Sequence, residues 1–168
     1  MIFVCAMTMA QTNAYPLLPM PQNYKVTDKS FAMGKVKLST PVLESEWEAF
    51  IVNAGGELAD KAAAEIKVEL LPVIDGVKLN PDEAYRLSVS GKLIKIEAVT
   101  ERGVYWALQT LRQLEKKKGK KSLFAGCEIV DWPAFRIRGF MQDVGRSYIS
   151  VEELKREIEI LSRFKINV

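Results

Sequence analysis

The chain has 168 residues, which is room for one domain and part of a second. A hydrophobic fraction of 48% and a charged fraction of 27% are ordinary for a globular protein, and a net charge of +3 is too small to predict a nucleic-acid partner. There is no histidine. Within these residues, that excludes Ser-His and Cys-His nucleophile pairs, His-ligated zinc and an imidazole general base.

Residues 1–21 are predicted to be a signal remnant followed by a proline-rich lead-in. Residues 1–10 are apolar and uncharged, and Thr8-Met9-Ala10 resembles a signal cleavage site, which predicts a secreted or periplasmic protein. The alternative is a disordered tail. At about ten residues the apolar stretch is too short to span a bilayer, so no membrane span is expected.

The cysteines point to no metal site and no cofactor. Cys5 and Cys127 are far apart and have no metal-type spacing. Cys5 falls within the predicted signal remnant, which leaves Cys127 as a single thiol. We expect Cys127 to be a small buried apolar residue.

Residues 22–130 are predicted to form one α+β domain, with a mainly antiparallel or mixed sheet covered by helices on one face. Apolar residues alternate with polar ones in the expected strands and recur at three- and four-residue steps in the expected helices. The elements expected in chain order are short strands within 24–38, a helix at 44–53, a strand at 66–71, a hairpin of 85–90 and 94–98, a helix at 101–115 capped by Thr100, a solvated lysine loop at 116–121 and a strand at 123–130.

Residues 131–168 follow a different pattern, which predicts the start of a second domain. The Trp132-Pro133 break precedes an apolar strand at 137–141, and Ser150 with Glu153 forms a capping box for a helix that leads to a second strand at 165–168. Strand, helix and strand form one βαβ unit, as at the start of a (β/α)₈ barrel or a doubly wound sheet. One unit cannot bury its own faces, so we expect this tail to be a fragment of one of these folds, with an exposed helix face that promotes self-association.

Three charged residues of this segment are candidates for a site. Arg138 lies early in the expected strand, Asp143 lies near its C-terminal end and Arg146 lies in the following loop. Barrel active sites lie at the C-terminal ends of the strands, and a guanidinium suits sugar hydroxyls. The alternative is an Arg-Asp pair that supports the loop, which we favour for Asp143 and Arg146; for Arg138 both interpretations stay open.

Other candidates have simpler explanations. Glu128 and Asp131 could be imagined as the paired carboxylates of a glycosidase, but neither has a second partner nearby, so surface placement is expected for both. The three tryptophans, Trp47, Trp106 and Trp132, could stack on sugars, but each also fits an apolar face, and core packing is the expected outcome.

Two motifs resemble glycoside hydrolase family 20, the β-N-acetylhexosaminidases. The first runs from the hairpin of residues 83–98 to residues 103–114, Gly-Val-Tyr-Trp-Ala-Leu-Gln-Thr-Leu-Arg-Gln-Leu, and is similar to a helix of that family's N-terminal accessory domain. The second, residues 131–146, is similar to the entry strand of the catalytic barrel, with Ser147 in place of the family's usual histidine. Residues 161–168 resemble the lead into the second barrel strand.

The resemblance implies a site and a mechanism. It implies that Arg138 binds hydroxyls of a terminal N-acetylhexosamine, and that the acetamido oxygen of the substrate attacks the anomeric carbon. It places the assisting Asp-Glu pair on a later strand, beyond Val168, so the chain itself is expected to be inactive and N-acetylhexosamine glycans are the partners of the longer protein. The rival hypotheses are a non-catalytic domain that binds a glycan or a protein, and a related glycosidase such as an α-glucuronidase.

Overall fold

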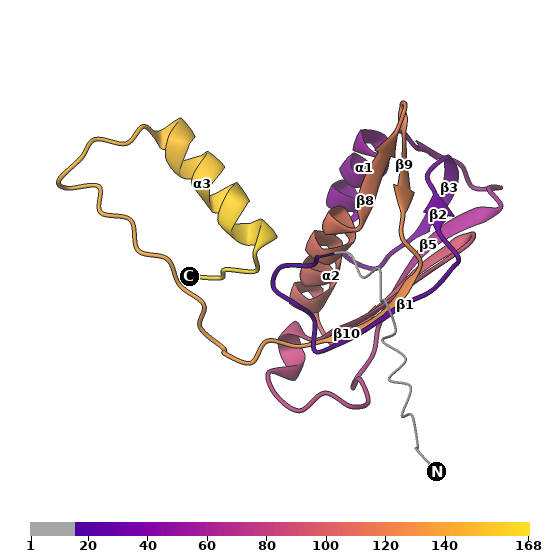
Figure 1. The fold of residues 1–168 in the computed structure, drawn as a ribbon, viewed down its shortest axis with the longest axis horizontal. Coiled ribbons are helices and arrows are strands. Elements are labelled where there is room, and N and C mark those ends of the chain that lie inside the picture. The colour runs from indigo at the N-terminus through magenta and orange to yellow at the C-terminus, as the bar shows by residue number, and fades with distance from the viewer. Residues whose placement is uncertain (1–15) are drawn as a thin grey trace, which may run out of the picture.

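The computed structural model describes residues 16–168 and contains two sheets and three α-helices within that range (Figure 1). Residues 1–10, with the predicted signal segment and Cys5, lie outside it. The larger sheet has seven strands in the order β1-β10-β6-β7-β5-β3-β4, and the smaller has three in the order β2-β9-β8. The bounds are β1 Asn23–Val26, β2 Phe31–Ala32, β3 Lys35–Ser39, α1 Glu44–Asn53, β4 Glu57–Leu58, β5 Ala64–Leu70, a 3₁₀ helix Pro81–Glu83, β6 Tyr85–Ser90, β7 Leu93–Ala98, α2 Glu101–Gln113, β8 Glu115–Lys118, β9 Lys121–Phe124, β10 Cys127–Asp131 and α3 Val151–Arg163.

The seven-stranded sheet is mixed, which confirms the predicted α+β class. β1, β10, β6 and β7 pair antiparallel in that order, whereas β5 pairs parallel with both β7 and β3, and β4 pairs parallel with β3. The predicted hairpin is present, because Ser90 pairs with Leu93 across Gly91, whose φ of 50° suits a tight turn.

One face of the sheet packs against α1 and α2 and forms the core (Figure 1). Leu87 and Ile96 of the sheet and Leu108 of α2 are fully buried, and so is Trp47 of α1. Thr100 caps α2 as predicted, since its side chain accepts a hydrogen bond from Arg102 N. Cys127 is buried and free, and burial raises the pKa of its thiol to about 12, as expected for a structural cysteine.

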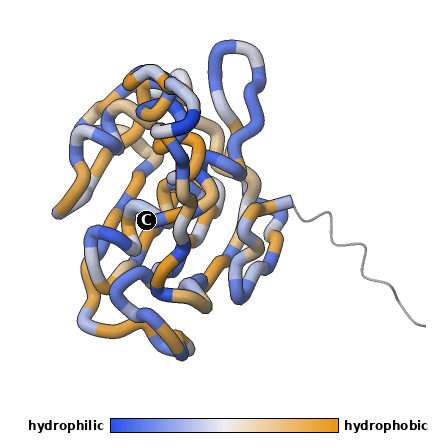
Figure 2. Tube along the Cα trace, turned by 90° about the vertical axis from the view of Figure 1, so that its left-hand side faces the viewer, coloured by the Kyte–Doolittle hydropathy of each residue, from blue (hydrophilic) through white to orange (hydrophobic). Residues whose placement is uncertain are grey.

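The opposite face carries a ladder of charges instead of a second helical layer. Lys95 Nζ lies 2.7 Å from Glu97 Oε1 and 3.0 Å from Glu69 Oε2, while Arg86 Nη1 lies 3.1 Å from Glu97 Oε2. The same two-residue alternation that buries the apolar side chains brings these groups together, and Figure 2 shows hydrophobic and hydrophilic residues changing over short distances along the chain.

The charged ladder should make stability depend on acid. Burial raises the pKa of Glu97, but hydrogen bonds from Lys95 and Arg86 outweigh it, and the pKa of Glu97 lies below its ordinary value of 4.5. Hydrogen bonds from Lys67 and Lys95 likewise lower the pKa of Glu69. A carboxylate with a depressed folded-state pKa stabilises the fold above its unfolded pKa, and this stabilisation is lost as the pH falls through the folded-state pKa.

We therefore expect the free energy of unfolding, measured in urea, to fall below about pH 4.5. Glu97→Gln should lower it at pH 7 and reduce its difference between pH 7 and pH 3. Glu48→Gln, on an exposed position of α1 outside the ladder, is the control. Identical pH profiles for Glu97→Gln and the parent chain would contradict the role of the ladder.

Two predictions about residues 115–130 are wrong in detail. The lysine run is part of a hairpin, β8 and β9, in which Lys118 pairs with Lys121 across Gly119 at φ 64°. In β9 buried side chains alternate with more exposed ones, and Ser122 is buried, but the neighbouring run of lysines gives no sign of this alternation in the sequence. The single strand expected at 123–130 is divided at Gly126, where a Cβ would come within 2.5 Å of the Lys29 carbonyl oxygen, and its two halves join different sheets.

The strands expected at 137–141 and 165–168 are also wrong, because both segments are irregular. A strand needs a neighbour along its length, and here only a short backbone pairing exists: Asn167 N and Val168 N donate to the Arg138 carbonyl at 2.9 and 3.3 Å, and Phe140 N donates to the Val168 carbonyl at 2.9 Å. These bonds run in the parallel sense.

Helix α3 stands apart from the sheets at the end of a long loop (Figure 1). Its capping box of Ser150 and Glu153 is present as predicted. No α3 residue is buried, and Ile158 on the expected inner face is 66% exposed. Self-association through this face stays a prediction.

Candidate functional site

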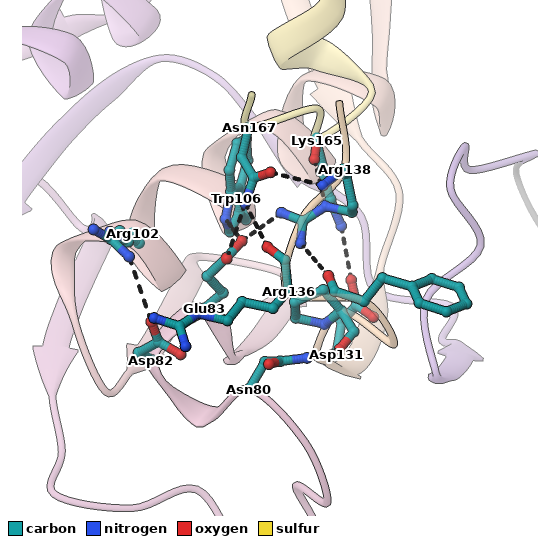
Figure 3. A network of polar contacts seen from close by, with 12 residues as sticks. Asn80, Asp82, Glu83, Arg102, Trp106, Asp131, Arg136, Arg138, Lys165 and Asn167 are labelled. Atoms are coloured by element: carbon teal, nitrogen blue, oxygen red, sulfur yellow. Dashed lines mark hydrogen bonds and ion pairs between the residues drawn. The ribbon is translucent and has the colours of Figure 1, made fainter. Parts of the chain in front are cut away.

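Polar side chains from distant parts of the chain meet where the α+β domain contacts the C-terminal segment (Figure 3). We call this group the docking cluster. It contains three residues from before the Trp132-Pro133 break and three from after it: Glu83, Tyr85, Asp131, Arg138, Lys165 and Asn167.

Glu83 is the centre of the first half of the docking cluster. It ends the short 3₁₀ helix and is 3% exposed, yet its carboxylate is fully engaged. Its Oε2 accepts from Trp106 Nε1 at 2.7 Å and from Arg138 Nη2, and its Oε1 accepts from Asn167 Nδ2 at 3.2 Å. A buried carboxylate with such partners avoids the cost of an unpaired charge.

Arg138 is enclosed on several sides. Its Nε donates to the Lys165 carbonyl and its Nη1 to the Phe135 carbonyl, each at 2.7 Å, and its guanidinium carbon lies 5.6 Å from the centre of the Trp106 ring. The side chain is 15% exposed. Its backbone N donates to Asn167 Oδ1 at 2.9 Å, so side chain and backbone are both held.

The second half of the docking cluster is built on Lys165. Its Nζ lies 2.7 Å from Asp131 Oδ2 and donates to the Tyr85 hydroxyl at 2.9 Å, and the side chains of Lys165 and Asp131 are 8% and 11% exposed. The Tyr85 hydroxyl also donates to Asp131 Oδ2 at 3.0 Å, and Asp131 Oδ1 accepts from Gln22 N at 3.1 Å.

Burial changes the titration of this half. It lowers the pKa of Lys165, and the negative charge of Asp131 opposes that change. It raises the pKa of Tyr85 well above its ordinary value, and the charge of Asp131 acts in the same direction. The hydroxyl therefore stays protonated and serves as a neutral donor.

Lys165 also has an unusual backbone. Its φ is 61°, a left-handed conformation that costs about 1–2 kcal/mol for a residue with a side chain. Lys165 N donates to the Ser162 carbonyl and Ile166 N to the Leu161 carbonyl, the hydrogen bonds of a Schellman motif at the end of α3. Glycine is the usual residue at this position, because it has no Cβ that would strain the backbone.

A small cavity lies beside the docking cluster. Its volume is about 190 Å³, and Glu83, Trp106, Asp131, Arg138 and Lys165 are among the residues that line it. The charged groups that line the cavity are already paired with one another. A ligand could therefore contact mainly its aromatic walls and the remaining N–H groups of Arg138.

The predicted site residues fall into two places. Arg138 lies in the docking cluster, whereas Asp143 and Arg146 lie in the exposed loop beyond it. Asp143 Oδ2 is 2.8 Å from Arg146 Nε, and Asp143 Oδ1 accepts from Gly145 N at 2.8 Å and from Arg146 N at 3.2 Å. The sugar contact expected of Arg138 and the loop support expected of Asp143 and Arg146 stay predictions.

The surface placement predicted for Asp131 is wrong. It is 7% exposed, because Lys165 approaches from a segment 34 residues away. Glu128 is exposed as expected, at 3.5 Å from Lys25. All three tryptophans are buried, which confirms the expected core packing.

Glu83, Tyr85, Lys165 and Asn167 were not predicted as site residues from the sequence. Each lies in a short stretch whose pattern gives no sign of a long-range partner, and only the fold brings them together. One signal in the sequence was Asp131, a carboxylate directly before the Trp132-Pro133 break at the predicted domain boundary.

Two further observations concern the described range alone. Among residues 16–168, no three His, Cys, Asp or Glu side chains gather as a metal site. No helix in this range is both long and apolar enough to cross a membrane.

The mixed sheet with helices on one face forms an α+β domain, and the C-terminal segment contacts it through the docking cluster. The model of glycosyl hydrolase family 20, domain 2, matches residues 14–132, which is more than half of the chain. The chain therefore belongs to glycoside hydrolase family 20.

Individual relatives agree with this assignment. The chain is similar to a β-hexosaminidase of Porphyromonas gingivalis (29% identity over 167 residues, covering 90% of this chain and 21% of the relative) and to one of Vibrio furnissii (30% over 158 residues, covering 90% and 25%). It thus spans about a quarter of the length of these curated relatives.

Solved structures show the same fold. An exo β-N-acetylglucosaminidase of this family from Vibrio harveyi, in complex with N-acetylglucosamine, matches at 32% identity and a TM-score of 0.74, covering 91% of this chain and 24% of that one. A β-N-acetylhexosaminidase from Bacteroides fragilis matches at 25% identity and a TM-score of 0.76, covering 92% and 32%.

Proposed function

We propose that the chain is the N-terminal part of a β-N-acetylhexosaminidase, which removes terminal N-acetylhexosamine from glycans by substrate-assisted retaining hydrolysis. The observation that carries the proposal is the family match over residues 14–132, followed in the same chain by a segment docked on that domain. The Vibrio harveyi relative in complex with N-acetylglucosamine supports the substrate class.

Residues 131–168 are proposed as the start of the catalytic barrel, with α3 as its first helix. The capping box of α3 and the parallel backbone bonds between 138–140 and 167–168 support this proposal. The general acid and its acidic neighbour would come from later strands, and Arg138 remains the sugar-binding candidate that the family resemblance implies. The apolar N-terminal segment supports a secreted or periplasmic location.

An activity comparison tests the proposal. The longer gene product should cleave an aryl N-acetyl-β-glucosaminide, whereas residues 1–168 should not, because loss of a general acid alone costs about two to four orders of magnitude in rate. Absence of cleavage by the longer protein would contradict it. Binding of a glycan by residues 1–168, detected by calorimetry, would instead favour a glycan-binding domain.

A further inference from the structure

The docking cluster divides by charge between the two parts of the chain. Asp131 is the last residue of β10 and so belongs to the sheet of the accessory domain, one residue beyond the predicted boundary. The accessory domain therefore contributes the carboxylates of Glu83 and Asp131, and the C-terminal segment contributes the cations of Arg138 and Lys165. Each acid meets one base, and both pairs are largely buried. Such complementarity selects one register between two surfaces, because any shift would leave buried charges without partners.

Side chains of the docking cluster also bind the two backbone segments, 138–140 and 167–168, that form the short parallel pairing. Glu83 holds Asn167 Nδ2 and the Arg138 guanidinium, and Asn167 in turn binds the backbone of Arg138 through Oδ1 and the carbonyl of Arg136 through Nδ2 at 2.9 Å. The parallel bonds between 138–140 and 167–168 therefore form directly on the accessory domain.

The left-handed backbone of Lys165 points to the same role. A lysine replaces the usual glycine at the end of α3, although glycine would avoid the strain. Strain of this kind persists where the surroundings require the side chain, and here the side chain reaches the Asp131 carboxylate and the Tyr85 hydroxyl.

We infer that Glu83, Tyr85 and Asp131 form an acidic receptor on the accessory domain for the basic C-terminal segment, with Arg138 and Lys165 as the two residues that it binds. In this role Arg138 is a positioning residue. It fixes the chain ahead of the loop that carries Asp143 and Arg146. This role differs from the sugar contact that the family resemblance implies for Arg138.

The sharpest test is Lys165→Gly in the 168-residue chain. If the backbone conformation of residue 165 alone determined how the C-terminal segment docks, glycine would relieve the strain. Hydrogen exchange of the amides in the docked segment would then slow. If the receptor binds the Lys165 side chain, the opposite is expected. The amides of Phe140, Asn167 and Val168 should exchange about tenfold faster or more, because Asp131 loses its buried partner. Unchanged or slower exchange would overturn the inference.

A second pair of variants distinguishes loss of the receptor contact from a general loss of stability. Glu83→Gln should speed exchange of the same three amides, whereas Asp82→Asn should not, because Asp82 is the neighbouring residue and its pair with Arg102, at 3.5 Å, is exposed. Amides in β6 and β7 should keep their protection in both. If Glu83→Gln does not fold, Arg138→Gln removes the same pair from outside the matched domain. Equal exchange in Asp82→Asn and the folded partner variant would contradict the receptor.

A kinetic comparison, which rests on the proposed function, tests Arg138 itself. In the longer protein, Glu83→Gln and Arg138→Gln should lower kcat/KM to a similar extent, and the double variant should be no worse than the worse single one. A rise in KM in Arg138→Gln alone, multiplied in the double variant, would show a sugar contact and overturn the positioning role. Absence of hydrolysis would count against the proposed function, while the exchange measurements would still test the receptor.

Discussion

Replacement of Trp47 by alanine is expected to lower the free energy of unfolding by about 3–5 kcal/mol, as for other fully buried tryptophans. Trp47 is fully buried on α1, and its ring meets that of Phe50 edge-on, with the centroids 5.9 Å apart. Alanine would leave a cavity at the contact between α1 and the sheet that the packed neighbours could fill only in part. Urea denaturation followed by far-UV circular dichroism measures the loss.

Trp47→Phe is the matched control for this prediction. Within residues 16–168, the Trp47 indole Nε1 has no hydrogen-bond partner, so phenylalanine removes a buried polar group along with some apolar area. We expect a loss below about 1.5 kcal/mol, in the range of tolerated apolar exchanges. A Trp47→Phe loss as large as that of Trp47→Ala would show that the indole N–H has an essential partner.

Gly103→Ala is expected to destabilise the fold by about 1–3 kcal/mol, although alanine in a helix is normally favoured over glycine by about 0.5–1 kcal/mol. A Cβ at Gly103 would lie 2.2 Å from the Ala84 carbonyl oxygen and 3.0 Å from the Ala98 Cβ. The first of these atoms belongs to the backbone of Ala84, the residue directly before β6, so α2 would have to move away from the sheet. The reversed sign is the informative result, measured by thermal and urea unfolding.

Gly145→Ala serves as the comparison for Gly103. Its nearest neighbour to an added Cβ is Asp143 Oδ1 at 3.4 Å, an ordinary contact in an exposed loop. We expect a change within about 0.5 kcal/mol. Stabilisation by Gly103→Ala would mean that α2 does not approach β6 as closely as the structure describes.

Local patterns predicted the elements of the accessory domain well. Helix 44–53 and the hairpin of β6 and β7 agree with the structure, because each buries one face whose period is visible in consecutive residues. The lysine hairpin was missed because four-residue strands with solvated lysines show no apolar alternation. A strand was wrongly predicted at 137–141 because apolar residues indicate burial. They do not show whether the neighbouring strands that a strand needs are present.

The docking cluster could not be predicted in the same way. Glu83 lies 55 positions from Arg138, and Asp131 lies 34 from Lys165. The sequence shows that these residues carry opposite charges, but the pairing depends on where a 3₁₀ helix and the end of α3 lie in space. Arg138 was a candidate because of its place in a motif, and its partner could not be identified from that motif.

The pairing of β1 with β10 has a consequence for the order in which the domain can fold during synthesis. Asn23 pairs with Val130, so the first strand leaves the ribosome roughly a hundred residues before its partner. The β6–β7 hairpin can form from neighbouring residues as soon as it emerges, whereas β1 must wait with its backbone groups unpaired. Among the strands of residues 16–168, β1 is thus expected to be the last to join the sheet, and the long delay exposes it to association with other nascent chains.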